Sequence, residues 1–103
     1  MNMLVIDTAS NKIIKVGLKT EHGLDIVEQK IAVQKAQIVL PLIDKLLKKH
    51  KRKLYDITSI EVNTGPGSFT GLRVGISIAN ALGFVLKIPI NGEKIEVFVE
   101  PRY

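Results

Sequence analysis

Apolar residues change their spacing along this chain, and the order of those changes limits the folds that it can adopt. Residues 3–7 are an apolar run ended by an acid, which predicts a buried strand. Residues 12–19 alternate apolar and polar side chains, and residues 24–33 follow a short Glu-His-Gly turn, so each segment predicts a further strand. Together the three segments predict an antiparallel meander.

Helical spacing follows the meander. Within residues 34–53, apolar side chains recur three and four positions apart, which predicts an amphipathic helix. A short strand over 58–63, a second helix over 71–87 and a short strand over 88–92 complete the order. Because a helix joins the last two strands, these strands should be parallel and connected by a right-handed crossover.

This order of elements predicts an α/β fold of the ribonuclease-H-like kind. We expect a single lobe, with a mixed five-stranded sheet and two main helices, over residues 1–92. Residues 93–103 are assigned to a C-terminal strand or tail.

The composition is that of a folded protein without a disulfide framework. The chain has 103 residues, of which 46% are hydrophobic, and it contains no cysteine. The first residues lack a signal-peptide pattern and no apolar run is long enough for a bilayer, so we expect a cytoplasmic protein without membrane contact. Much of the net charge of +5 comes from Lys48–Lys53, which is either the solvated end of a helix or a contact for RNA or an acidic partner.

The stretch TGPGSFTGLR, residues 64–73, joins a predicted strand to a predicted helix. It lacks the lysine of a phosphate-binding P-loop, and Thr70 stands where a dinucleotide fingerprint has its third glycine. Two interpretations remain: a tight turn capped by Ser68 or Thr70, or an anion site at the start of the helix. The residues assigned to this structural or nucleotide-binding loop are Asp7, Thr8, Gly65, Gly67, Ser68 and Thr70.

The helix after this loop carries a small residue at every fourth position, namely Gly71, Gly75, Ala79 and Gly83. Glycine inside a helix costs roughly 0.5–1 kcal/mol relative to alanine, so the repetition predicts a closely packed partner on this face. A second, apolar stripe is formed by Val74, Ile78, Leu82 and Val85. One side can cover the sheet, and the other needs either the first helix or another protein chain.

The acidic residues do not form the pattern of a nuclease of this fold class. Asp7 ends the first strand, where such enzymes hold a metal-binding carboxylate. The first helix offers only Asp44 as a second carboxylate, and the fourth strand ends near Asn63. Asp7 is therefore expected to fix a turn, and His22 and His50 are expected on the solvated surface. We predict no catalytic residue and no metal site.

The segments MLVIDTAS, QIVLPLIDKLL and GPGSFTGLRVGISIANAL, followed by KIPI, resemble the TsaB (YeaZ) family over about residues 3–91. The resemblance implies a lobe of the actin-like ATPase superfamily. It also implies a role in the bacterial machinery that makes N6-threonylcarbamoyladenosine at the adenosine beside the tRNA anticodon (position 37). Within that machinery it implies a non-catalytic subunit that dimerises through its two helices, with itself or with a TsaD-like catalytic subunit. A TsaE-like ATPase is a further implied partner, and the chain would contact tRNA only as part of the complex with these proteins.

The resemblance also implies which residues form the interface. They are Ile38, Leu42, Leu46, Gly71, Arg73, Gly75, Ile76, Ala79 and Gly83. No cofactor is expected on the chain alone, whereas ATP or ADP with magnesium is expected within the complex. The sequence departs from the family in two respects: members usually have a second lobe of similar architecture, and they often have a His-Ser pair where Lys35 and Ala36 stand here.

Two alternative functions remain open from the residues. One is an autonomous nucleotide-binding, ATPase-like protein, which ATP turnover by the purified chain would reveal. The other is a small basic RNA-binding module that uses Lys48–Lys53, which predicts a tRNA affinity that falls steeply with salt.

Overall fold

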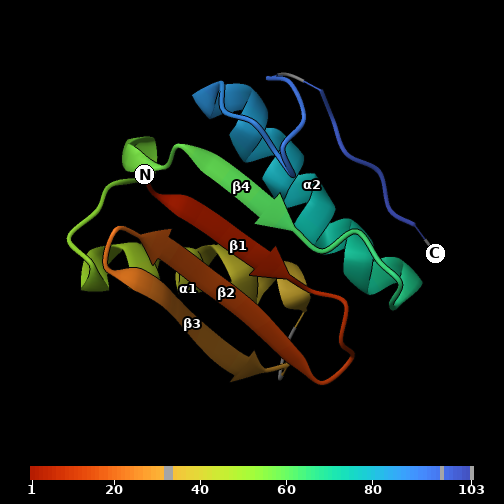
Figure 1. The fold of residues 1–103 in the computed structure, drawn as a ribbon. Coiled ribbons are helices and arrows are strands. Elements are labelled where there is room, and N and C mark those ends of the chain that lie inside the picture. The colour runs from red at the N-terminus through yellow and green to blue at the C-terminus, as the bar shows by residue number, and fades with distance from the viewer. Residues whose placement is uncertain (32–33, 96, 103) are drawn as a thin grey trace.

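The computed structural model describes residues 1–31, 34–95 and 97–102. They form one four-stranded sheet with two long helices (Figure 1). The strands lie in the order β3-β2-β1-β4 across the sheet, so the first strand in the sequence is an inner strand.

The first three strands form the predicted antiparallel meander. They are β1 (Met3–Asp7), β2 (Ile13–Thr20) and β3 (Gly23–Lys30). β2 pairs antiparallel with both of its neighbours, and β3 lies at the edge of the sheet. Residues 32 and 33, which the sequence assigned to the third strand, lie outside the described residues.

The second half of the lobe adds one parallel strand and both helices. The elements are α1 (Lys35–Lys49), a short 3-10 helix η1 (Leu54–Asp56), β4 (Ser59–Val62) and α2 (Phe69–Leu86). β4 pairs parallel with β1. α1 ends four residues before the predicted end at Lys53 because Lys51 turns into the left-handed region at φ 56°.

Both helices pack on the same face of the sheet, and the core lies between them and the strands. α1 packs mainly on β2, α2 packs on β4 and β1, and the two helices contact each other. Alternate strand residues point into this core, namely Leu4, Ile6, Ile14, Val16, Leu18, Ile60 and Val62. The residues between them point to the opposite face of the sheet. No helix in the described part of the chain combines the length and the apolar character needed to cross a bilayer.

The prediction of five strands is wrong for the described residues, because the expected fifth strand pairs at a single residue. Ile90 makes one parallel bridge with Ile60. Pro89 has no amide hydrogen, and Asn91 has a positive φ of 52°, so the chain turns away before a ladder can form. The Asn91 side chain replaces the ladder, since its amide group accepts from Val62 N at 2.8 Å and donates to Val62 O at 3.0 Å.

The described residues beyond position 92 form no strand. Residues 97–102 run in an irregular path beside α2 (Figure 1). They are described as the 97–102 segment below.

Candidate functional site

Two neighbouring parallel strands, β1 and β4, end at the same edge of the sheet, where polar side chains join them. The Asp7 carboxylate accepts hydrogen bonds from the Ala9 amide at 3.0 Å and from the Asn63 side chain at 3.2 Å. The Asn63 side-chain oxygen accepts a bond from Gly65 N at 2.9 Å. Asp7 therefore holds both the turn after β1 and the start of the glycine loop, in agreement with the turn-fixing role expected of it.

The next residue, Thr8, is fully buried and reaches into α2. Its hydroxyl donates to the Gly71 carbonyl oxygen at 2.6 Å and accepts from the Gly75 amide at 3.0 Å. These two glycines are four positions apart, which is the spacing of a helical hydrogen bond, so the hydroxyl joins the two ends of one helical turn. A Cβ atom at Gly75 would lie 2.7 Å from the hydroxyl oxygen. Glycine at position 75 thus makes room for Thr8.

α1 begins beside the same cluster. The Lys35 ammonium group donates to the Thr8 carbonyl oxygen at 2.9 Å. Burial lowers the pKa of Lys35, while the nearby Asp7 carboxylate acts in the opposite direction. Lys35, Asn11 and Thr70 line a hollow of about 400 Å³ between the β1–β2 turn and the first turns of both helices.

The glycine loop is a capped turn in which the main-chain amides of Gly65, Ser68 and Gly71 have partners within the chain. Ser68 is the N-cap of α2, since its hydroxyl accepts from Gly71 N at 3.3 Å, whereas Thr70 is exposed in the first turn. Ser68 N donates to Ala9 O at 3.2 Å, and Gly65 N is held by Asn63. A phosphate cradle needs main-chain amides that are free to point at the ligand. The amides of Gly65, Ser68 and Gly71 are committed to a structural turn.

The histidines and acids are spread over the surface of the lobe. Among the described residues, no group of three or more His, Asp or Glu side chains is placed to hold a metal ion. His22 is exposed, with its ring nitrogen 3.5 Å from the Glu21 carboxylate. His50 departs from the expectation of a solvated side chain, because its Nε2 atom lies 2.8 Å from Asp25 Oδ2. The two residues are 25 positions apart, and no local pattern in the sequence links them.

The residues that the sequence assigned to an interface lie mostly inside the chain. A Cβ atom at Gly75 would lie 3.2 Å from the Ile6 side chain, and one at Gly83 would meet the Ile90 side chain. The buried members are Ile38, Leu42, Leu46, Gly71, Gly75, Ile76, Ala79 and Gly83, while Arg73 is exposed. This placement corrects the expectation that the small-residue face is open to a partner. It packs on the sheet of its own chain, because short side chains allow α2 to approach the strands closely.

The two helices leave a different apolar surface exposed. We define the helix-pair surface as Leu40, Leu54, Leu82 and Val85. Leu40 is 52% exposed, Leu54 is 41% exposed and Val85 is 73% exposed. Leu40, Leu54 and Leu82 line a hollow of about 260 Å³ between α1, the start of η1 and α2. The sequence identified the stripe containing Leu82 and Val85, but Leu40 lies outside the predicted stripe of α1.

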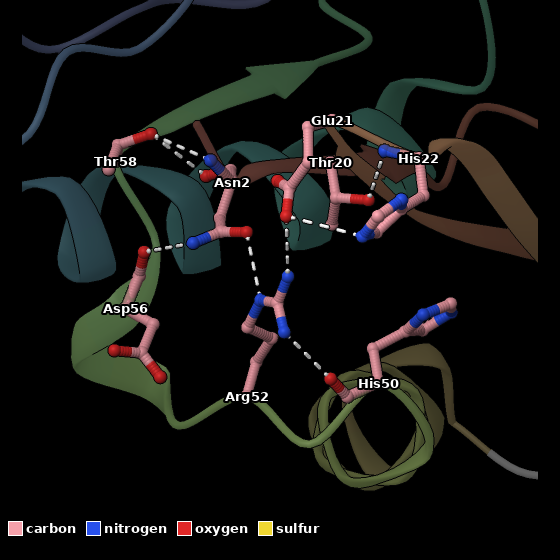
Figure 2. Close-up of polar contacts among 8 residues, drawn as sticks. All are labelled: Asn2, Thr20, Glu21, His22, His50, Arg52, Asp56 and Thr58. Carbon is pink, nitrogen blue, oxygen red and sulfur yellow. Dashed lines mark hydrogen bonds and ion pairs between the residues drawn. The ribbon is translucent and has the colours of Figure 1, made fainter.

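Part of the basic run after α1 has a structural role. Figure 2 shows the Arg52 guanidinium group between the chain start, the β2–β3 turn and the end of α1. It donates to the Asn2 side-chain oxygen at 3.1 Å, to the His50 carbonyl oxygen at 3.0 Å and to the Glu21 carboxylate at 3.4 Å. Asn2 also donates to the Asp56 carbonyl oxygen, so Arg52 helps to attach the α1–β4 connection to the sheet.

The Asp25 carboxylate fastens the C-terminal end of α1 to β3. One of its oxygens lies 2.8 Å from Lys49 Nζ and 2.8 Å from His50 Nε2. The hydrogen bond from Lys49, followed by that from His50, lowers the pKa of Asp25 below its ordinary value of 3.8. Since the pKa of Asp25 is lower in the folded chain than in the unfolded chain, its ionised form stabilises the fold. This contribution of Asp25 is fully present above pH 3.8 and is lost as the pH falls through the pKa of the folded chain.

We therefore expect Asp25→Asn to lower the urea midpoint at neutral pH, and the difference from the unaltered chain to shrink as the pH falls below 3.8. Urea unfolding followed by circular dichroism at several pH values measures this difference. Asp44→Asn is the matched control, because its partner Lys48 is 76% exposed and such surface pairs contribute little. A difference that persists unchanged at low pH would contradict the assignment.

Comparison with known proteins agrees with this architecture. A family model described as tRNA N6-adenosine threonylcarbamoyltransferase (TsaD) matches residues 9–94. The chain is 33% identical over 92 residues to the tRNA threonylcarbamoyladenosine biosynthesis protein TsaB of Escherichia coli, covering 89% of this chain and 39% of that protein. It is 36% identical over 93 residues to the protein of the same description from Bacillus subtilis, covering 88% of this chain and 40% of that protein.

A solved structure, YeaZ from Pseudomonas aeruginosa, superposes with a TM-score of 0.82 at 29% identity. The match covers 90% of this chain and 43% of that one. Together with the family match, it confirms the predicted α/β fold of the ribonuclease-H-like and actin-like kind. The chain spans about two-fifths of the length of these relatives.

Proposed function

This chain belongs to the TsaB/YeaZ family, within the threonylcarbamoyltransferase family whose model it matches, and we propose that it is a non-catalytic partner subunit in the formation of N6-threonylcarbamoyladenosine on tRNA. Involvement in that pathway follows from the family. The proposal adds that the chain contributes a surface for assembly rather than reacting groups, and that it acts in the cytoplasm.

The polar side chains at the carboxyl edge of the sheet support a structural role. Asp7 is engaged by Ala9 and Asn63, and Thr8 is engaged by α2. A nucleophile needs a hydroxyl directed at the substrate, and the Thr8 hydroxyl is instead bonded to Gly71 and Gly75 of α2. Both bonds of Asp7 go to its Oδ1 atom and hold turns. The commitment of the Gly65, Ser68 and Gly71 amides to the turn supports the further proposal that a nucleotide with magnesium belongs to the assembled complex rather than to this chain alone.

The proposed role in assembly rests on one observation, the exposed helix-pair surface. An exposed aliphatic patch on two packed helices is the kind of surface that protein partners cover. We propose that a second copy of this chain, or a TsaD-like subunit, packs its own helices on Leu40, Leu82 and Val85. The position of the interface thus moves from the small-residue face, which is buried, to the neighbouring side of α2.

We expect Leu40→Glu and Val85→Glu to weaken association while the chain stays folded. A carboxylate placed in an apolar interface is desolvated without a partner, which costs roughly 2 kcal/mol, or about thirtyfold in Kd. Light scattering after size exclusion measures the molar mass of each chain alone and mixed with a TsaD-like protein. Circular dichroism of the same samples verifies the fold.

Leu24→Glu is the matched control. Leu24 is 52% exposed, as Leu40 is, but it lies on β3 and points away from the helices. Normal association of Leu24→Glu with loss of association in Leu40→Glu would support the assignment. Equal association of both variants would place the interface elsewhere, and an unaltered chain that remains a monomer with every partner would contradict the assembly role.

A further inference from the structure

The 97–102 segment follows the side of α2 that faces away from α1 (Figure 1). Successive residues of a helix are rotated by about 100°, so Asn80 and Phe84 point to the opposite flank from Ile78 and Leu82. On α2, the 97–102 segment makes its hydrogen bonds with Asn80 and its aromatic contact with Phe84. This outer flank of α2 is therefore separate from the helix-pair surface.

Asn80 binds the main chain of the segment. Its side-chain oxygen accepts from Val99 N at 3.0 Å, and its side-chain nitrogen donates to Val99 O at 3.0 Å. The same pair of bonds joins opposite residues in an antiparallel sheet. Because both bonds go to main-chain atoms of Val99, Asn80 recognises an extended backbone without regard to the side chain that it carries.

Side chains on either side of this pair provide apolar contact. Phe98 meets Phe84 edge to face, with ring centroids 6.2 Å apart and planes at 73°. Val99 is half-buried against the core cluster. Among the described residues, the buried core residues lie at or before Ile90, and Val99 packs against the outside of that core.

The far end of the segment fixes the glycine loop. Arg102 N donates to Thr64 O at 2.6 Å. Gly65 has a φ of 128°, a conformation that side-chain-bearing residues rarely adopt. A Cβ atom at Gly65 would overlap the Arg102 carbonyl oxygen. Only glycine allows the two backbones to pass this closely, so the loop is shaped to receive the segment.

We infer that the outer flank of α2 is a docking site for an extended peptide, that the 97–102 segment occupies it in this chain, and that this occupancy holds the glycine loop in place. Three contacts define the site along the helix: Phe84 for an aromatic side chain, Asn80 for a peptide group, and Thr64 O for a main-chain amide. The site is independent of the proposed assembly role.

Two forms of the chain test the inference by amide hydrogen exchange. One ends at Lys94, and the other is the full chain with Asn80→Ala. In the shortened chain we expect the amides of the glycine loop to exchange about tenfold faster or more, while those of β1 and β2 keep their protection. In Asn80→Ala we expect the Val99 and Arg102 amides to lose protection by a similar factor. Ser77→Ala, on the exposed side of α2, is the matched control and should change nothing.

A synthetic peptide of the sequence KIEVFVEPRY, which corresponds to residues 94–103, completes the test. Added to the shortened chain, it should bind and restore slow exchange in the glycine loop, and Asn80→Ala in the shortened chain should abolish that rescue. Unchanged loop exchange without the segment, or a peptide that does not bind, would overturn the inference. A shortened chain that no longer folds would also overturn it, because the segment would then be part of the core.

Discussion

Replacing Gly75 with leucine is expected to lower the free energy of unfolding by about 3 kcal/mol or more, because the new side chain has no space. A Cβ atom at this position would already lie 2.7 Å from Thr8 Oγ1 and 3.2 Å from Ile6 Cγ2. The remaining leucine atoms would force α2 away from β1 and break both hydrogen bonds of Thr8. Urea unfolding, followed by circular dichroism, measures the loss. A loss of this size is a large fraction of the roughly 5–15 kcal/mol by which a domain is ordinarily stable.

Ser77→Leu is the matched control for this prediction. Ser77 is exposed on the same helix, two residues further along, and leucine has the higher helix propensity. We expect little change in the urea midpoint for Ser77→Leu. If Gly75→Leu were as stable as Ser77→Leu, α2 would not pack on the sheet as described. Leucine at position 75 is therefore a test of the fold, and the association of the chain is better tested at Leu40 and Val85.

Thr8→Val is expected to cost about 2–3 kcal/mol, although valine has nearly the same shape as threonine. The substitution removes the hydroxyl that satisfies the Gly71 carbonyl and the Gly75 amide. Both main-chain groups are buried, and each would lose its bond to the hydroxyl away from water. Thermal and urea unfolding of the purified variant measure this loss.

Thr8→Ser provides the complementary variant, since serine keeps the hydroxyl and loses only a methyl group. If the hydrogen bonds carry the effect, Thr8→Ser should be clearly more stable than Thr8→Val. The reverse order would show that the methyl packing of Thr8 matters more than its bonds to α2.

The sequence predicts the elements of this fold well, because each depends on neighbouring residues. The meander, both helices and the strand β4 follow from apolar spacing and turn residues, whereas the parallel pairing of β4 with β1 was not predicted. The prediction of a fifth strand was wrong for a reason that the spacing of apolar residues does not reveal. The run around Ile90 has an apolar pattern, but Pro89 and the positive φ of Asn91 end the pairing after one residue.

The site was harder to predict, because its contacts join residues that are far apart in the sequence. Thr8 was recognised only as part of a turn, yet its side chain reaches residues 63 and 67 positions further along. The two faces of α2 were both recognised, but the sequence left open which of them packs on the sheet, and the resemblance implied an interface at the small-residue face. Small residues allow either a sheet or a second chain to approach a helix closely. Only the packed structure shows that Gly75 lies against Ile6 and Gly83 lies against Ile90 of the same chain.

The insertion of the Thr8 hydroxyl into α2 also couples the helix to the turn that follows β1, so that the two move together. Any partner that rolled or tilted α2 would have to separate Gly71 and Gly75 from the hydroxyl or pull the turn after β1 along with the helix. Asp7, Lys35 and the glycine loop are attached to that same turn. A partner that moved α2 on binding would therefore be energetically linked to the shape of the loop edge, and by reciprocity a change of the edge would alter the affinity of that partner by the same factor.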